Sequence, residues 1–205
     1  MAKEVREKET DAVEVVVPNE LPVLPVRDTV LFPHSVLPLT IGRESSTALI
    51  NSLGENKFLA VATQRDPHTD APGPADLHSV GAVGVLHKVI RMPNQSLFVF
   101  CEGICRMRIV EVLSQDPFLR ARVEPLLDAE PERTPELEAL RQNAVSVFQQ
   151  IVAVVPALSE DLQSMAANIS ELGRLADFLA ASLPTLSSAE RQEVLNELDV
   201  RLRLD

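Results

Sequence analysis

Four prolines within residues 21–44 constrain what this chain can fold into more than any other feature. The segment reads LPVLPVRDTVLFPHSVLPLTIGRE, and Pro22, Pro25, Pro33 and Pro38 separate its short runs of valine, leucine and isoleucine. A proline inside a helix removes a backbone donor and its ring clashes with the preceding turn, so no helix can run through this segment. Within sheets, proline is tolerated at edges and bulges. The sequence therefore predicts short extended strands here, each at a sheet edge or a bulge.

Strand patterns dominate up to about residue 128. Apolar runs rich in valine, isoleucine and phenylalanine are separated by turn residues, and several alternate apolar with polar positions. Glu102-Gly103 is interpreted as a turn between two of these strands. One helix is expected at 44–53, where Gly54 follows the last apolar residue. We expect strands at 57–63, 79–90, 96–101, 104–113 and 118–126, and a proline-rich loop at 65–76.

Helix patterns begin after the polar segment DAEPERTP. Thr134 is a predicted N-cap followed by Pro135, and apolar residues then recur at helical spacing as far as Val155. Three more helices are predicted: one over 159–169, one after a Ser170 cap that ends before Pro184, and one that begins at Ser187 and continues to Asp205. The last one stops in mid-pattern, which suggests a chain cut from something longer or a helix that docks on a partner.

These patterns predict an α+β fold in four parts. Residues 1–20 form a charged arm, 21–128 a β domain, 129–134 a linker and 135–205 a helical bundle. With 45% hydrophobic residues and a mean hydropathy of +0.07, the chain can bury a substantial core. That core must be largely aliphatic, because the sequence has no Trp or Tyr and seven Phe.

The charge and composition argue against several classes of function. A net charge of −11 opposes binding to nucleic acids and to anionic membranes, which both need clustered Lys and Arg. No apolar run approaches the ~18–20 residues of a membrane span. The charged N-terminus is unlike a secretory signal, and two cysteines are too few for a disulfide framework. We therefore expect a cytoplasmic protein that binds neither nucleic acid nor membrane.

Three separate segments resemble the N-terminal domain of Lon, the ATP-dependent protease family. They are LPVLPVRDTVLFPHSVLPLTIGRE, SVGAVGVLHKVIRMPNQSLFVFCEGICRMRIVEV and LGRLADFLAASLPTLSSAERQEVLNELDV, in that order, so the resemblance covers about residues 20–205. It implies a PUA-like β-barrel or β-sheet domain followed by a helical bundle. It also implies a non-catalytic part of a homohexameric protease, which recognises unfolded or damaged protein substrates and supports hexamer assembly. The ATPase and protease domains of the same polypeptide would be its partners.

The catalytic parts of that family are missing from this sequence. A Walker A loop needs a lysine after a glycine to hold phosphates, and none of the four lysines follows a glycine. The family's Ser–Lys dyad would lie beyond residue 205. We therefore expect this chain to be no enzyme and to hold no cofactor, whereas the full-length protease that it resembles uses ATP and Mg.

Exposed apolar residues on turns are the candidates for substrate binding. Leu31, Phe32 and Pro33 lie between two predicted strands, and Met92 and Pro93 lead a hairpin tip. If the two tips are neighbours, they form one apolar patch of the size that marks interaction sites. The alternatives are that Phe32 fills the core and that the exposure of Met92 is incidental.

Other reactive residues are better explained by structural roles. His68 and His78 share a loop with Asp70 and Asp76, but one proline-rich loop gives a metal no rigid geometry. No metal site is therefore expected. We expect His34 to be a hydrogen-bonding residue of a turn or of the core. Asp28 is expected to cap a turn and Arg27 to cover apolar surface, and Cys101 and Cys105 are expected to be thiols on strands.

The sequence leaves four candidate functions. The leading hypothesis is the substrate-recognition domain of a Lon-type protease; the second is a free-standing Lon-domain adaptor for one specific partner. A gene that continues beyond Asp205 into a Walker A loop would decide for the protease. An RNA-binding PUA-like domain is disfavoured by the acidic charge, and a small-molecule enzyme by the lack of an acid–base or nucleophile constellation.

Overall fold

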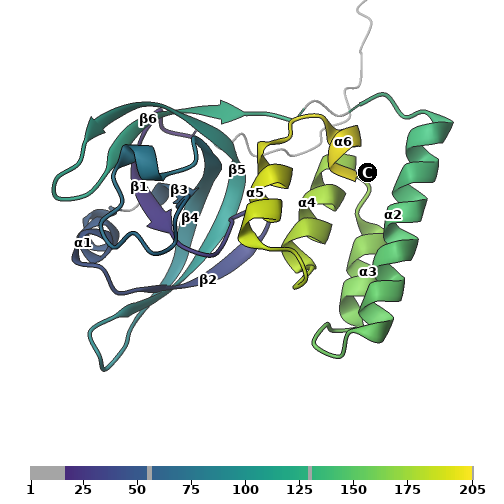
Figure 1. Ribbon diagram of the computed structural model, residues 1–205, viewed down its shortest axis with the longest axis horizontal. Helices are drawn as coiled ribbons and strands as arrows, with labels where there is room; N and C mark the ends of the chain where they lie inside the picture. The colour runs from purple at the N-terminus through teal and green to yellow at the C-terminus, as the bar shows by residue number, and fades with distance from the viewer. Residues whose placement is uncertain (1–16, 55–56, 129–130, 205) are drawn as a thin grey trace, which may run out of the picture.

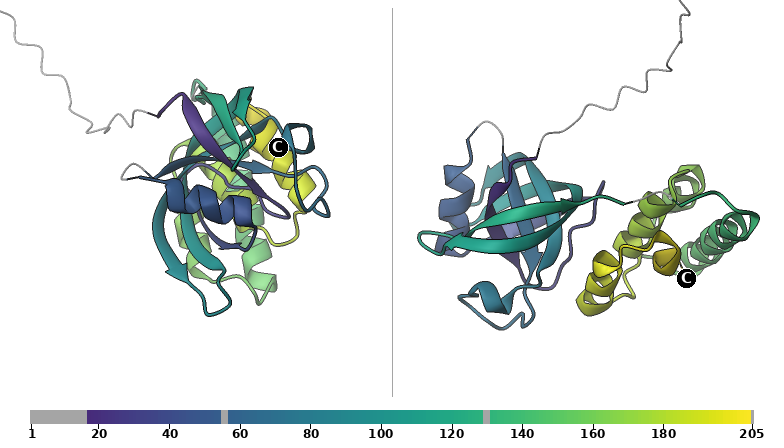
Figure 2. Two further views of the ribbon diagram at one scale, coloured as in Figure 1. Left: turned by 90° about the vertical axis from the view of Figure 1, so that its left-hand side faces the viewer. Right: turned by 90° about the horizontal axis from the view of Figure 1, so that it is seen from above.

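The computed structural model describes residues 17–54, 57–128 and 131–204, so residues 1–16 of the predicted charged arm lie outside the described part. A β-sheet structure and a group of helices lie side by side, joined through the end of the last strand (Figure 1). The view from above separates the two most clearly, with α5 closest to the strands (Figure 2). The predicted α+β class, strands first and helices after, is confirmed.

Within the described residues, six strands form one mixed sheet in the order β2-β5-β4-β3-β1-β6. Because β5 also pairs with β6, the strands from β5 to β6 close into a barrel and β2 is left as an edge strand. β1 and β3 are parallel, and the other strand pairs are antiparallel. The strands are β1 (Glu20–Val26), β2 (Val36–Ile41), β3 (Phe58–Thr63), β4 (Val80–Arg91), β5 (Leu97–Ser114) and β6 (Arg120–Leu126); α1 (Glu44–Ser52) and a short 3₁₀ turn, η1 (Pro74–Asp76), lie between them.

The prediction of two strands separated by a turn at Glu102-Gly103 is wrong, because β5 runs unbroken from Leu97 to Ser114. Gly103 is needed there for another reason. A Cβ atom at this position would lie 2.1 Å from the carbonyl oxygen of Phe32. The glycine therefore lets the chain before β2 pass directly against the middle of β5.

In the described range 131–204, five helices follow the sheet. Two of the predicted starts are confirmed: the Thr134 side chain accepts a hydrogen bond from the Leu137 amide, and Ser187 forms a capping box with Glu190. The buried apolar faces of α2, α3, α4 and α6 share one core, which includes Phe148, Leu175 and Val200. The helices are α2 (Pro135–Val154), α3 (Asp161–Asn168), α4 (Leu172–Ser182), α5 (Ser188–Asn196) and α6 (Val200–Leu204).

Two predicted details of the helices are wrong. The N-cap of α4 is Glu171 rather than Ser170. The helix expected to continue to Asp205 is broken between α5 and α6, where the Glu197 side chain accepts from the Asp199 amide and the Asp199 side chain accepts from the Arg201 amide. Such local bonds offer the backbone an alternative to the helix, so they end one helix and begin the next.

An apolar cluster joins the sheet to the helices. Phe32, fully buried, packs with Val80 of β4, Ala180 of α4 and Leu195 of α5. The buried Gln192 of α5 also donates to the Val80 carbonyl at 2.9 Å. The sheet and the helices are therefore packed together through a shared apolar cluster.

Beside that cluster lies a buried network of charges. Arg106 of β5, with a side chain 1% exposed, donates to both carboxylate oxygens of Asp177 in α4, at 2.7 and 2.5 Å. Arg203 of α6 donates to the same carboxylate at 3.0 Å and lies 2.7 Å from Asp128, which follows β6. The Arg106 Nε atom donates to the Leu195 carbonyl at 3.0 Å. The network thus connects the sheet, the end of β6 and three helices.

Candidate functional site

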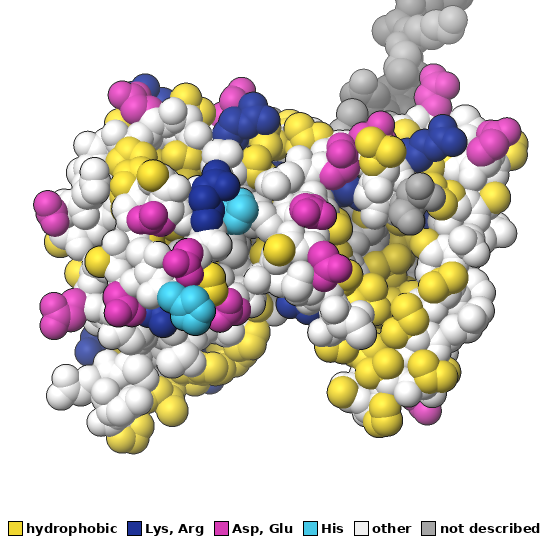
Figure 3. Space-filling view, viewed as in Figure 1, with side chains coloured by type: hydrophobic (Ala, Val, Ile, Leu, Met, Phe, Trp, Pro, Cys, Tyr) yellow, Lys and Arg dark blue, Asp and Glu magenta, His cyan; other side chains and the backbone are white. Residues whose placement is uncertain are grey.

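A groove of about 650 Å³ lies between the turn that precedes β2 and the helices α3 and α4. We call it the sheet–helix groove. In the space-filling view, the molecule is notched at its lower edge between the sheet and the helices, with hydrophobic side chains on both sides (Figure 3). Its apolar lining comes from Pro33, Val36, Met165, Ile169, Phe178 and Ala181.

The sheet wall of this groove is held in a fixed shape by backbone contacts. The His34 amide donates to the Gly103 carbonyl at 2.7 Å, and the Gly103 amide donates to the Ser35 carbonyl at 2.9 Å. The Ser35 hydroxyl donates to the Phe32 carbonyl at 2.7 Å. His34 has a positive φ of 59°, which lets the chain turn sharply into β2. Pro33 and Val36 are consequently presented to the groove by a rigid turn.

The helical wall combines apolar side chains with two charges. Met165 of α3 is 52% exposed, and Phe178 of α4 is held edge-on against Phe148 with a centroid distance of 6.0 Å. Glu171 is the N-cap of α4, and Arg174 lies in the first turn of that helix. Hydrogen bonding to its own backbone amide lowers the pKa of the Glu171 carboxyl, and the charge of Arg174 contributes less. The wall is thus apolar and adaptable, with charged groups at its rim.

The first predicted tip is placed differently from the expectation. Leu31 and Phe32 are 2% and 0% exposed, so the prediction that they are exposed contacts is wrong. Phe32 fills the space between the sheet and the helices, as the alternative interpretation of Phe32 as core had it. Pro33 is buried too, yet it lines the sheet–helix groove.

The second predicted tip, Met92-Pro93, is exposed but lies far from the first. Val36 pairs with Glu102 and Ile41 pairs with Leu97, so the two tips are at opposite ends of β2. At about 3.4 Å a residue, that separation is roughly 17 Å along the strand. The expected single patch of neighbouring tips is therefore not formed.

A strip of half-exposed apolar residues runs between these two ends instead. Directly paired residues share one face of a sheet, so Val36 and Pro38 of β2 lie beside Glu102 and Phe100 of β5. We call this face the outer strip and define it by Val36, Pro38, Phe100, Phe98 and Ile90. The rings of Phe98 and Phe100 meet edge to face at 5.2 Å. This strip was not predicted from the sequence, although Phe98 and Phe100 alternate with the core residues Leu97 and Val99.

The remaining candidates have structural roles. Asp70 accepts a hydrogen bond from Arg27 at 2.9 Å, so the Arg27 side chain pairs with a residue of the 65–76 loop. Within the described ranges, no group of three or more His, Cys, Asp or Glu residues could hold a metal ion. Burial first, and then the charge of Glu102, raises the pKa of the Cys101 thiol to about 12. Burial also raises the pKa of Cys105.

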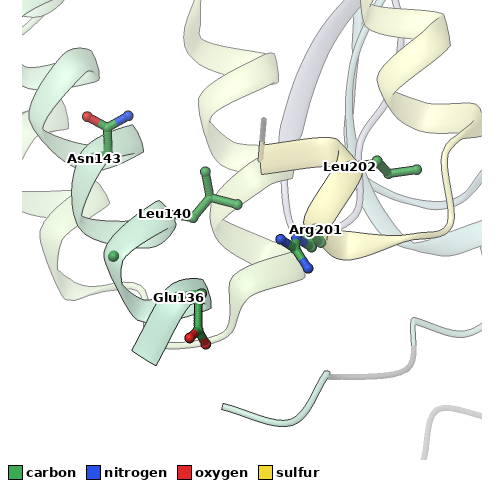
Figure 4. Close-up of a pocket in the computed structure, with 6 residues that line it drawn as sticks. Glu136, Leu140, Asn143, Arg201 and Leu202 are labelled. Carbon is green, nitrogen blue, oxygen red and sulfur yellow. The ribbon is translucent and has the colours of Figure 1, made fainter. Parts of the chain in front are cut away.

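A smaller cavity of about 390 Å³ lies between the start of α2 and α6 (Figure 4). Its lining mixes Leu140 and Leu202 with the polar side chains of Glu136, Asn143 and Arg201. Its lining residues all belong to α2 and α6, and none of them is among the site residues predicted from the sequence. Of the helices between residues 17 and 204, none is long and apolar enough to cross a membrane.

The fold occurs in solved structures of Lon N-terminal domains. One is the N-terminal domain of the Mycobacterium avium complex Lon protease, with a TM-score of 0.74, 22% identity and coverage of 90% of this chain and 94% of that one. Another is a Lon N-terminal domain protein from Xanthomonas campestris, with a TM-score of 0.64, 19% identity and the same coverages, 90% and 94%. At these identities the likeness establishes the fold.

Sequence comparison extends this to the family. The chain is 55% identical over 185 residues to the Lon protease of Koribacter versatilis, and 38% identical over 189 residues to that of Dictyoglomus thermophilum. These alignments cover 90% and 92% of this chain but only 23% and 24% of the two relatives, so the chain corresponds to a fraction of each. Residues 20–205 match the family described as the ATP-dependent protease La (LON) substrate-binding domain, and the chain belongs to that family.

Proposed function

We propose that this chain is the substrate-recognition part of a Lon-type ATP-dependent protease, and that it binds apolar segments of unfolded or damaged proteins. The observation that carries the proposal is the sheet–helix groove, which is apolar, open and continuous with the outer strip through Val36. Exposed apolar surface of this kind marks interaction sites. The chain itself would cut nothing and hold no cofactor.

The proposal also includes the rest of the protease and its assembly. The captured segment would pass to ATPase and protease domains of the same polypeptide, which would use ATP and Mg, in a cytoplasmic homohexamer that this domain helps to assemble. A single shallow site binds in the range of about 10 µM to 1 mM. Six copies in one assembly would raise the apparent affinity by roughly 10²–10⁴-fold through effective concentration.

The test compares one protein in two states as ligand. The chain is titrated with a chemically unfolded protein and with the same protein folded, and binding is followed by NMR chemical shifts. We expect weak binding of the unfolded form, with shifts at Val36, Met165 and Phe178. Absence of binding to either form would overturn the proposal and leave a partner-specific adaptor as the better interpretation.

A matched set of variants locates the site. Val36→Glu and Met165→Glu each place a charge in the sheet–helix groove, and both positions are exposed enough to accept it. Val154→Glu makes the same change at a side chain 76% exposed on α2, outside the groove. The first two should weaken binding at least fivefold and the third should not. Equal loss in all three would mean that binding follows net charge and has no site in the groove.

A further inference from the structure

The edge strand β2 has a free side. In the part of the chain that the structure describes, β2 occupies one end of the sheet order and pairs with β5 alone. Every second residue of a strand directs its backbone N–H and C=O to the same side. The pairing with β5 therefore determines which backbone groups of β2 face away from the sheet.

Hydrogen bonds at the start of the strand give the phase of this alternation. The Ser35 carbonyl accepts from Gly103 of β5, so Ser35 faces β5. The register from Val36 to Ile41 is continuous, so Leu37, Leu39 and Ile41 face β5 as well. Val36, Pro38 and Thr40 consequently direct their backbone groups outward. The only proline inside the strand thus falls on the outward side, where its missing N–H costs no ladder bond.

Grooves lie along both ends of this free side. The sheet–helix groove reaches β2 at Val36. A second groove of about 570 Å³ lies between β2 and the end of β1, lined by Pro25, Val26, Leu39, Thr40 and Ile41 among others. Unpaired donors and acceptors in line between two apolar grooves fit one kind of ligand, an extended polypeptide with apolar side chains.

We propose that a substrate segment binds in extended form as an added strand on the free side of β2, between Val36 and Thr40. This rests on the proposed function, and it identifies the substrate class as an extended backbone rather than a set of side chains. The outward groups can accept three hydrogen bonds, at the carbonyls of Val36, Pro38 and Thr40, and can donate two, from the amides of Val36 and Thr40.

Backbone pairing explains how one site serves unrelated substrates and still ignores folded proteins. The N–H and C=O groups of a strand are the same in every sequence, so the bonds do not depend on side chains. In a folded protein more than about 90% of buried backbone groups are already paired. An unfolded segment of about five residues spans the distance from Val36 to Thr40, roughly 14 Å.

The experiment uses a fluorescent nine-residue peptide that alternates serine with leucine and valine, and a second peptide with the same side chains but N-methylated at every residue. N-methylation removes the donors that the Val36, Pro38 and Thr40 carbonyls require. We expect the methylated peptide to bind the 205-residue chain at least tenfold more weakly in anisotropy titrations. At about 1 kcal/mol for each hydrogen bond, even two lost bonds account for that factor.

Two substitutions at one residue test the protein side. Thr40→Pro removes an outward N–H without touching the pairing to β5, and Thr40→Val keeps it. Thr40→Pro should weaken the unmethylated peptide about fivefold, the effect of one hydrogen bond, and Thr40→Val should bind as the parent does. Thermal unfolding of both variants checks that the fold is kept, and the peptide comparison holds even if Thr40→Pro does not fold.

The outcomes separate the two proposals. If the unmethylated peptide and the chemically unfolded protein both fail to bind, the proposed function is overturned. If they bind, but the methylated peptide binds equally well and Thr40→Pro has no effect, apolar recognition stands and strand addition is overturned. Loss with the methylated peptide and with Thr40→Pro supports strand addition.

Discussion

Substitution of Asp177 by asparagine should destabilise the chain strongly, because its carboxylate lies at the centre of the buried charge network. The Asp177 carboxylate is 2% exposed and accepts hydrogen bonds from both Arg106 and Arg203. Asparagine keeps the shape but removes the negative charge, so two buried guanidinium groups lose one of the two carboxylates that they share. Breaking a buried pair costs about 3–5 kcal/mol. Since Asp128 and the Leu195 carbonyl still contact Arg106, we expect the lower end, about 3 kcal/mol.

Urea and thermal unfolding measure this loss. For a chain of this size 1 kcal/mol corresponds to about 2–4 °C, so Tm should fall by about 6–12 °C. Asp70→Asn is the matched control, because it makes the same chemical change in an exposed ion pair with Arg27. Such exposed pairs contribute about 0–1 kcal/mol, so the control should hardly change Tm.

A double-mutant cycle decides whether the loss comes from the pair. Arg106→Met removes one of the two positive charges that contact Asp177. The free energy of unfolding lost by the double variant, Arg106→Met with Asp177→Asn, should be at least about 1 kcal/mol smaller than the sum of the losses in the two single variants. A Tm for Asp177→Asn equal to that of the control would refute the reasoning. So would strict additivity, because the two residues would then stabilise the fold independently.

Three further predictions follow from the contacts described. Gly103→Ala should lower the free energy of unfolding by about 2–4 kcal/mol in urea titrations, because its methyl group would overlap the Phe32 carbonyl and the backbone must move; an unchanged midpoint would contradict the close approach. At pH 8, iodoacetamide should leave Cys101 unmodified in the folded chain and alkylate it in urea, because burial raises its pKa to about 12 and only the thiolate reacts. Alkylation is measured by mass spectrometry, and rapid alkylation of Cys101 in the native protein would count against this prediction. Ser187→Ala should cost about 1 kcal/mol through loss of the N-cap, measured by chemical denaturation, and Ser188→Ala, one residue inside the helix, should have a much smaller effect.

Local signals in the sequence were sufficient for most of the elements. Pro22 and Pro25 lie in β1 and Pro38 lies in β2, whereas Pro33 lies in the turn before β2. The expected position at a sheet edge or a bulge is confirmed for β2 and wrong for β1, because β1 pairs with β3 and β6 on its two sides. Pro135 begins a helix, and the Ser187 capping box is formed. These features depend on backbone chemistry within a few residues. Gly103 shows where such local reasoning fails: a glycine in a polar dipeptide indicates a turn, but here it accommodates a segment some seventy residues earlier in the chain.

The candidate site was harder to predict, for a physical reason. Phe32 is apolar and lies next to a turn, and sequence alone cannot distinguish a residue exposed on a turn from one buried between two halves of a molecule. The sheet–helix groove is built from residues 33–36 and residues 165–182, so no single segment carries its pattern. Alternation in 97–100 could have indicated the outer strip, since Phe98 and Phe100 occupy the face opposite to the core.

One wall of the sheet–helix groove belongs to the sheet and the other to the helices, so the groove depends on the contacts between these two halves of the molecule. The groove exists only while Phe32 and the Arg106–Asp177 contacts hold α4 against the sheet. Damage that separates the halves would abolish the groove while the barrel and the helices each keep their own core. Conversely, a ligand that spans both walls acts as a clamp, and by mass action it stabilises the joined form by RT ln(1 + [L]/Kd). The thermal stability of the junction can therefore serve as a direct reporter of groove occupancy.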